Sequence, residues 1–367
     1  MGRSTYRLYL GGAQADEIGL ARVEELRVDL AVDMAAEARV MIPMGRDETG
    51  EWPVVLEDEL GPESRVRVEV SVGDDAFVPI FDGRVAAQRF ELSGGPNESR
   101  AIVVAQDESA FMNREDRVRL FQDMAPEDIA ANVFAEAGLR PDTDSSGVGA
   151  PSLERMTMQR GTDFAFLRRL ARASNMAVWV EPDDAQGTSV GLFKRMPIGS
   201  DRLPELLVTG RDRNVNRLVV EMDALAPVEA QAERIDPADL SVLSADADAT
   251  GRELLGDVAT SDFARRGVVF LASTAPDLSQ VEAAAQGTVD RGAWAYSAEG
   301  ETTTEIYPGL LRPYRVVPVA GAGGRLSGDW FVAEVSHVFT DHGHAQRFAL
   351  RRNAHSGAGG GGLGGIV

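Results

Sequence analysis

The sequence of 367 residues contains no cysteine, which excludes disulfide bridges, thiol catalysis, iron–sulfur clusters and cysteine-based zinc sites. Lysine is almost absent too, because Lys194 is the only one and arginine carries the other positive charges. No apolar run approaches the ~20 residues of a membrane-spanning helix, and the longest, such as 268–272, have the length of a core strand. Met1–Leu10 lacks the continuous apolar segment of a signal peptide, so we expect synthesis in the host cytoplasm and no membrane insertion.

Positive charge is scarce relative to negative charge. The chain has 58 Asp and Glu against 37 Lys and Arg, a formal net charge of −21. A surface of this sign repels phosphate groups, which disfavours specific nucleic-acid recognition and adhesion to anionic membranes. Hydrophobic residues make up 44% of the chain, enough to form buried cores, and the length suggests two or three domains.

Motifs typical of enzymes are missing as well. The sequence has no G-x-x-x-x-G-K phosphate loop, no G-x-S-x-G nucleophile elbow and no H-E-x-x-H zinc helix. Neighbouring carboxylates occur at 57–59 and 183–184, but side chains adjacent in sequence diverge in direction and favour a plain acidic surface. We therefore expect no catalytic residue, no cofactor and no enzymatic activity.

All four histidines lie after residue 336, and three of them lie close enough in sequence to be considered as ligands of one metal ion. His337, His342 and His344 fall near an expected hairpin turn, where Asp341 is the neighbouring carboxylate. No further carboxylate spacing supports a metal site. An ordinary solvated hairpin is the preferred interpretation.

Two acidic segments imitate calcium loops. Segment 246–251 with Asp257 matches positions one, three, six and twelve of the twelve-residue calcium loop. Thr250 is a poor ligand at position five, and Asp257 replaces the usual glutamate at position twelve. Segment 142–147 begins similarly and has Leu153 at the twelfth place. Neither pattern predicts a metal site, and the second favours a plain loop.

The first part of the chain, residues 1–108, has the period of two that is typical of half-buried strands. Apolar residues alternate with polar ones in 26–32 and again in 66–72. Turn signals at 11–12, 73–75, 82–83 and 94–96 divide the segment into short strands. We expect an all-β domain of barrel or sandwich type.

The middle part, residues 109–208, predicts a small α/β domain. Pro126 can begin a helix that buries residues on one face and ends at Gly138. A second helix is expected to start with Thr162 as N-cap and to bury Phe166 and its apolar neighbours, followed by a strand at 177–180. The intervening loop, 141–151, is rich in Asp, Ser and Gly.

The last part, residues 209–354, predicts a second β domain with an insertion around 235–300. Strands are expected at 217–222, 303–307, 314–319, 329–338 and 347–351. Within the insertion, Ser279 and Glu282 form a capping box that opens a helix. Residues 355–367 are expected to be a glycine-rich flexible tail.

Five groups of residues occur in a characteristic order: 81–85, 107–121, 125–130, 159–171, and a C-terminal group at 307–310, 327–332, 335–337 and 347–350. The most recognisable phrase, Gln-Arg-Gly-Thr-Asp-Phe-Ala-Phe-Leu-Arg-Arg-Leu-Ala, fills 159–171. In this order they resemble the phage late control D family, the baseplate hub proteins of contractile tails, which are related to the hub part of VgrG.

The resemblance implies a mainly β fold of two tail-tube-like β-barrels plus a small α/β domain. It also implies a structural baseplate hub of a contractile phage tail or phage-like injection system, assembled into the virion tail or the particle. Such hubs form a homotrimer ring that adapts the six-fold tail tube to the three-fold spike around a central channel. The implied partners are the tail tube ring, a separate spike protein and other baseplate proteins. An acidic bore would let nucleic acid pass without sticking.

Two alternatives remain open. A cell-wall hydrolase would need paired acids in a cleft, for which the sequence offers no such pair. A receptor- or glycan-binding β module would need exposed aromatic platforms, and its candidates are Trp52, Trp179, Trp294 and Trp330. Trp179 and Trp330 lie within expected strands, so burial in the core is the favoured interpretation for them.

Overall fold

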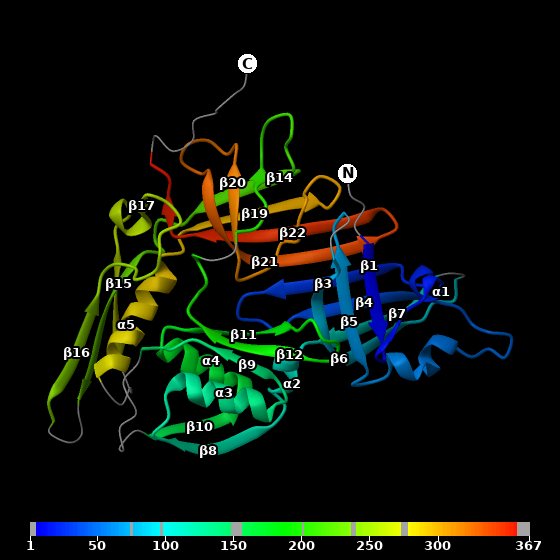
Figure 1. Ribbon diagram of the computed structural model, residues 1–367, viewed down its shortest axis with the longest axis horizontal. Helices are drawn as coiled ribbons and strands as arrows, with labels where there is room; N and C mark the ends of the chain where they lie inside the picture. The colour runs from blue at the N-terminus through cyan, green and yellow to red at the C-terminus, as the bar shows by residue number, and fades with distance from the viewer. Residues whose placement is uncertain are drawn as a thin grey trace.

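A computed structural model describes residues 5–73, 76–95, 98–147, 156–199, 202–235, 240–272 and 278–357. The chain forms a first β region, an α/β region, a second β region and an insertion within the latter (Figure 1). Among these residues no helix combines the length and apolar character needed to cross a bilayer.

The first β region contains β1 (Thr5–Leu10), β2 (Ala13–Gln14), β3 (Glu25–Ala31), β4 (Glu37–Met44), β5 (Arg65–Ser71), β6 (Val78–Glu91) and β7 (Ser99–Gln106). Short helices α1 (Glu17–Ala21), η1 (Pro53–Leu56) and η2 (Asp58–Leu60) connect some of them. The predicted alternation is confirmed, because Leu26, Val28, Val66, Val68 and Val70 are fully buried in one shared core.

The α/β region contains α2 (Glu108–Phe111), β8 (Asp116–Gln122), α3 (Pro126–Glu136), β9 (Arg140–Thr143), β10 (Met156–Thr162), α4 (Asp163–Ala173), β11 (Ala177–Pro182) and β12 (Ser189–Lys194). The predicted helix starts are confirmed at Pro126 and after Thr162, and Gly138 ends α3 with a φ of 78°. Thr162 does not cap through its side chain; its hydroxyl donates to Asn113 at 2.7 Å instead.

One expectation for the α/β region was wrong. Residues expected to begin a loop at 141 belong to β9, which pairs in parallel with β12 and puts Pro141 opposite Gly191. Pro is tolerated there because β9 is the edge strand of the sheet ordered β11-β12-β9. Residues 148–155 of the expected loop lie outside the described residues.

The second β region contains β13 (Leu206–Leu207), β14 (Arg217–Met222), β19 (Tyr296–Thr303), β20 (Val316–Ala320), β21 (Gly328–Thr340), β22 (Gly343–Arg352) and the short pair of β17 (Val258–Ala259) and β23 (Ala354–His355). The strand expected at 303–307 was wrong. Thr303 ends β19, and its carbonyl accepts hydrogen bonds from the backbone N–H of Ile306 and Tyr307 in a turn. Residues 358–367 of the expected tail lie outside the described residues.

The insertion is a small layer of its own. Strands β15 (Val228–Ile235), β16 (Val242–Ala247) and β18 (Gly267–Ala272) form a sheet, and α5 (Leu278–Gly292) packs on it; the turn η3 (Thr260–Asp262) lies between β17 and β18. The helix was predicted, but the capping box was wrong. Ser279 lies inside the first turn because α5 already begins at Leu278.

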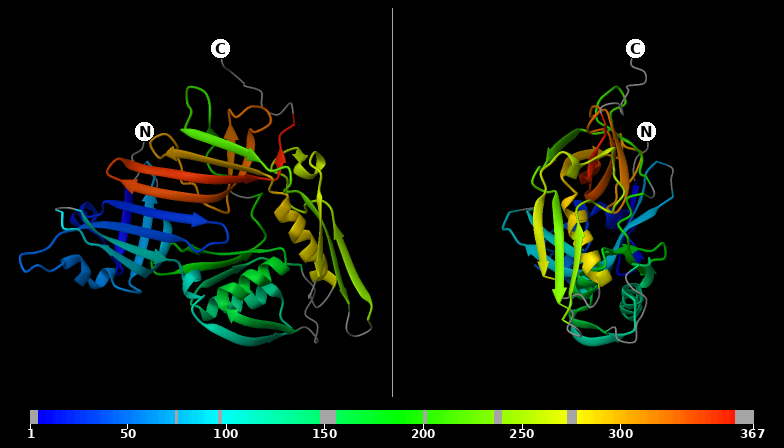
Figure 2. Two further views of the ribbon diagram at one scale, coloured as in Figure 1. Left: turned by 180° about the vertical axis from the view of Figure 1, so that it is seen from behind. Right: turned by 90° about the vertical axis from the view of Figure 1, so that its left-hand side faces the viewer.

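The two β regions share one open sheet, with the order β14-β19-β22-β21-β3-β4-β7-β6-β5-β1-β2 (Figures 1 and 2). In addition, β20 pairs with β21, and β13 pairs with β20. The start of β21 pairs with β20, and beyond a bulge at Val332/Glu334 the rest pairs with β3. The mainly β class with an α/β region is therefore confirmed. The two expected tail-tube-like β-barrels are not closed in the described residues, where both regions belong to one sheet.

Candidate assembly junction and sheet surface

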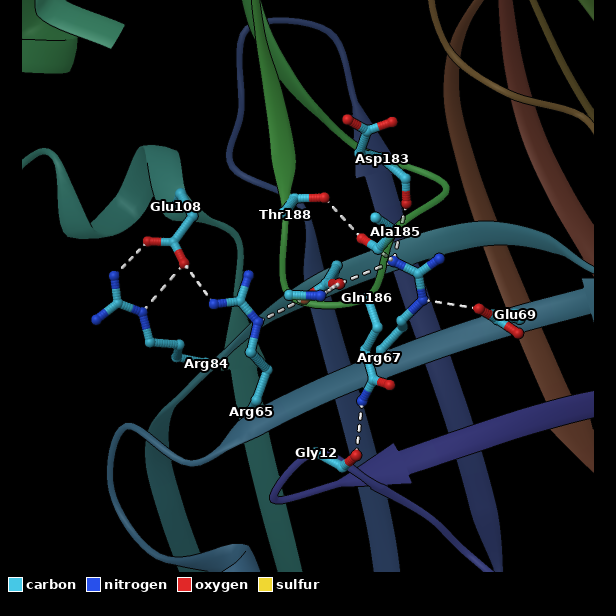
Figure 3. A network of polar contacts seen from close by, with 12 residues as sticks. Gly12, Arg65, Arg67, Glu69, Arg84, Glu108, Asp183, Ala185, Gln186 and Thr188 are labelled. Atoms are coloured by element: carbon cyan, nitrogen blue, oxygen red, sulfur yellow. Dashed lines mark hydrogen bonds and ion pairs between the residues drawn. The ribbon is translucent and has the colours of Figure 1, made fainter. Parts of the chain in front are cut away.

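A buried charged side chain lies where the first β region meets the α/β region. The Arg67 side chain on β5 is 1% exposed. Its Nε donates to Glu69 at 2.8 Å and its Nη1 to Asp82 at 2.9 Å. The same guanidinium donates to the backbone carbonyl of Asp183 at 2.9 Å (Figure 3). It also donates to the backbone carbonyl of Asp184 at 2.9 Å.

The loop between β11 and β12 is shaped to present those carbonyls. Gly187 adopts a φ of 80°, a left-handed conformation that favours glycine, and its N–H donates to Asp82 at 3.0 Å. The Thr188 hydroxyl donates to the carbonyl of Ala185 at 2.7 Å and tightens the turn (Figure 3). The loop therefore offers acceptors to Arg67 and a donor to Asp82.

Further ion pairs extend this junction along the sheet. Arg65 donates to Asp82 at 2.8 Å and lies 3.4 Å from Glu108, at the start of α2. Arg84 donates to Glu108 through Nη2 at 2.5 Å (Figure 3). Gln186 donates to the carbonyl of Gly12 at 2.8 Å, which ties the loop to the β1–β2 turn as well.

Electrostatics favour a fixed joint at this position. Burial by itself lowers the pKa of Arg67, but the hydrogen bonds and charges of Asp82 and Glu69 outweigh it and leave the pKa raised. The guanidinium thus stays charged and its partners stay occupied. A buried pair of this kind costs much free energy when one partner is lost, which suits it to hold two regions at a fixed angle.

The second feature is a groove of about 1130 Å³ over one face of the shared sheet. A single row of residues crosses six strands there, in the order Arg217, Glu301, Arg347, Ser336, Asp29 and Glu37. Glu301 binds Arg347 at 3.0 Å, and Ser336 donates to Asp29 across the seam between the two β regions.

The charge of this groove is nearly balanced. Its lining contains six carboxylates, namely Asp29, Asp33, Glu37, Glu299, Glu301 and Glu334, and five arginines, namely Arg27, Arg39, Arg168, Arg217 and Arg347. Several of these are joined in pairs, including Arg27 with Asp29 and Arg39 with Glu37. The surplus negative charge of the chain is therefore not concentrated on this face.

The histidines that were considered for a metal site do not converge. His337 and His344 are buried and lie 3.0 Å apart between Nδ1 and Nε2, whereas the His342 side chain is 90% exposed beside Asp341. His337 Nε2 must donate to the carbonyl of Leu311, 3.1 Å away, so its Nδ1 accepts from His344. Among the described residues no group of His, Asp and Glu is arranged to hold a metal ion.

The segment that resembles a calcium loop wraps around a carboxylate instead of a cation. Asp290 on α5 accepts hydrogen bonds from the Thr250 hydroxyl at 2.8 Å and the Gly251 N–H at 2.9 Å. Asp257, at the twelfth place of the pattern, accepts from the Gly357 N–H. The other acidic segment, expected to be a plain loop, begins in β9, where Asp142 pairs with Lys194 at 2.8 Å.

The tryptophans do not form an exposed platform. Trp330 is fully buried and Trp179 is 5% exposed, stacked on Tyr314 with ring centroids 4.0 Å apart. Trp294 is partly buried against the core around Phe331, and Trp52 is half-buried. The expected burial of Trp179 and Trp330 is confirmed.

Comparison with models of known protein families gives one match. The model of the Alg8 N-terminal domain family matches residues 4–341. The chain belongs to this family. The matching family model is thus not that of late control D, although the solved structures described next include phage tail proteins. No curated protein sequence matches the chain.

Several solved structures with this fold come from phage tails, and another comes from a secretion system. A tail protein from Neisseria meningitidis MC58 has 15% identity and a TM-score of 0.65, over 96% of this chain and 97% of that chain. The 43 kDa tail protein of prophage MuSo2 from Shewanella oneidensis has 15% identity and a TM-score of 0.65, over 95% and 98%. An E. coli component of the type VI secretion system has 13% identity and a TM-score of 0.57, over 94% and 76%. At these identities the likeness is one of fold.

For this member of the Alg8 N-terminal domain family, the sequence did not single out Arg67, although its partner Asp82 lies in a segment that carried part of the resemblance. The turn expected at 82–83 was wrong, because both residues lie inside β6 and pair with β5. The segment 81–85, which also carried part of the resemblance, supplies Asp82 and Arg84 to the junction. It also contains Gly83, where a Cβ would lie 2.2 Å from the carbonyl oxygen of Gln106. The sequence feature that could have indicated the junction is the pair of oppositely charged residues, Asp82 and Arg84, on either side of Gly83.

Proposed function

We propose that this chain is a structural hub of a phage tail or phage-like injection system, and that three copies form a ring around a channel. The observation that carries the proposal is the continuous sheet, in which both β regions join at β21 and β3 and present one polar face. A wall of this kind offers two unlike β regions per chain. Three chains would then present six regions to a six-fold tube while remaining three-fold toward a spike.

The free edges of the sheet supply the contacts that such a ring needs. In the described residues β14 pairs only with β19, and β1 pairs with β5 and, at its end, with the two-residue β2. Unlike edges of this type favour heterologous contacts, which close into a ring. The tail tube ring, a separate spike protein and other baseplate proteins are the proposed partners, and the proposed location is the assembled particle.

The charge distribution refines the proposal. If the polar face lines the channel, its six carboxylates and five arginines make the wall nearly neutral. We therefore no longer favour an acidic bore as the means of passage for nucleic acid. Three ion pairs, Arg27–Asp29, Arg39–Glu37 and Arg347–Glu301, engage six of these eleven charges, so the wall offers little net charge to any cargo.

Native mass spectrometry of the chain, coexpressed with the tube and spike proteins of the same particle, tests the proposal. We expect three copies per assembly. A ring of two or six copies would refute the hub model. Because isolated hubs can stay monomeric, the measurement on the complex decides.

A further inference from the structure

The insertion has an edge strand that no other described element covers. Strand β18 pairs only with β15, in a sheet ordered β16-β15-β18, and α5 packs on β15 and β16. Its sequence, Gly-Val-Val-Phe-Leu-Ala, has no charge and no proline. Val268 is 50% exposed and Phe270 is 76% exposed.

Such an edge is unusual because proteins ordinarily protect it. Lysine, proline, a bulge or a covering segment normally prevents a free edge strand from pairing with other chains. Among the described residues β18 has none of these, and its pairing with β15 is regular over all six residues. Figure 1 shows the insertion at the flank of the molecule, with α5 on the inner side of its sheet.

The backbone geometry identifies the groups that point outward. The Gly267 N–H donates to the carbonyl of Pro227 at 3.0 Å, so this residue is directed toward the β15 side. Hydrogen-bonding groups alternate along a strand, which directs the N–H and C=O of Val268 and Phe270 to the open edge. These residues can therefore form a ladder with an additional strand.

Charge near the edge selects the strand that would fit. On the face away from α5, Glu229 lies opposite Val268, and Gln231 lies between Phe270 and Asp246. Glu233 follows on the same face. No basic residue of the three strands shares this alternation, because Arg234 falls on the α5 side with Ala230 and Ala232.

We propose that β18 is a docking edge for an extended strand of a partner protein. The partner's strand has lysine or arginine at alternate positions, which lie on the same face of the sheet as Glu229 and Glu233. Apolar residues lie between them. The backbone ladder supplies affinity and the alternate side chains supply selectivity. This proposal does not depend on the hub function.

Fluorescence anisotropy with a labelled peptide of alternating valine and lysine, about eight residues long, tests the proposal. We expect saturable binding, and at least tenfold weaker binding of the matched peptide of alternating valine and glutamate. Equal binding of both peptides would overturn the assigned partner chemistry. Dimerisation of the chain through β18 in place of peptide binding would identify a second copy as the occupant and would also overturn it.

A pair of proline variants tests whether the peptide binds at β18. Phe270→Pro removes an N–H that faces the open edge and no bond to β15, so we expect at least a tenfold loss of affinity for the lysine peptide. The control is Val242→Pro, at the exposed first position of β16, which should bind as the wild type does. Unchanged binding by Phe270→Pro would refute the edge site.

Hydrogen exchange on the unmodified chain gives a second measurement that does not rely on variant folding. The amides of Val268 and Phe270 should exchange rapidly in the free protein and slow at least tenfold with the lysine peptide. Protection at other strands and not at β18 would contradict the proposal.

Discussion

The Arg67 guanidinium and the Asp82 carboxylate meet at 2.9 Å with side-chain exposures of 1% and 0%, at the joint between the first β region and the α/β region. Asp82 also accepts from Arg65 and from Gly187, so one carboxylate connects β5, β6 and the β11–β12 loop. Two segments separated by about a hundred residues in sequence are thereby held in one orientation.

Loss of Arg67 should destabilise the chain strongly. Arg67→Met leaves Asp82 with less neutralising charge and removes the donor of the Asp183 and Asp184 carbonyls, so we expect the free energy of unfolding to fall by about 3 kcal/mol or more. Urea denaturation measures it. Arg347→Ala, which breaks an exposed pair with Glu301, is the control and should change stability little. The double variant Arg67→Met, Asp82→Leu should recover part of the loss, and a further loss would contradict this account.

Gly83 should not tolerate a side chain. In Gly83→Ala the new Cβ would meet the backbone carbonyl of Gln106 at 2.2 Å, and a ladder carbonyl cannot move aside as a flexible side chain can. We expect a loss of about 2 kcal/mol or more in thermal or urea unfolding. Gly45→Ala, where no atom lies within 4 Å, is the matched control. Equal stability of the two variants would show that β6 and β7 relax freely.

The buried histidine pair predicts sensitivity to acid. Burial, and then the charge of Arg312, lowers the pKa of His337 to about 3; burial, and then His337, lowers that of His344 to about 2. Both take up protons near pH 6.5 when unfolded, so their stabilisation is complete above pH 6.5 and declines on acidification toward the folded values. Between these pKa values the free energy of unfolding falls by about 3 kcal/mol per pH unit of acidification for the two histidines together.

Thermal melts between pH 7 and pH 5 measure this effect. The double variant His337→Gln, His344→Gln should show a flatter stability profile over that interval than the wild type. His342→Gln removes an exposed histidine and should keep the wild-type profile. An unchanged slope in the double variant would mean that other groups cause the acid sensitivity.

The proposed structural role predicts no lytic activity. Carboxylates at the junction are engaged by arginines, as Asp82 and Glu108 are, so they are poorly suited to act as a general acid or base. Zymography with purified chain on peptidoglycan should give no clearing. A lytic band that disappears when one Asp or Glu is replaced would contradict the structural role.

Local pattern in the sequence determined the class of most elements. Alternation in 66–72 decides which side of β5 faces the core, and Pro126 and Gly138 fix the limits of α3, because these signals depend only on neighbouring residues. The motif at 81–85 likewise marked residues of the junction before their partners were known.

Only the tertiary structure decided which distant segments pair. The alternation of β3 and β21 is compatible with two closed barrels, but their pairing at Asp29 and Ser336 makes one open sheet. The same holds for Arg67, whose acceptors lie on a loop more than a hundred residues away, and for Thr250, whose hydroxyl binds Asp290. Burial and long-range hydrogen bonds choose among partners that the local sequence leaves equivalent.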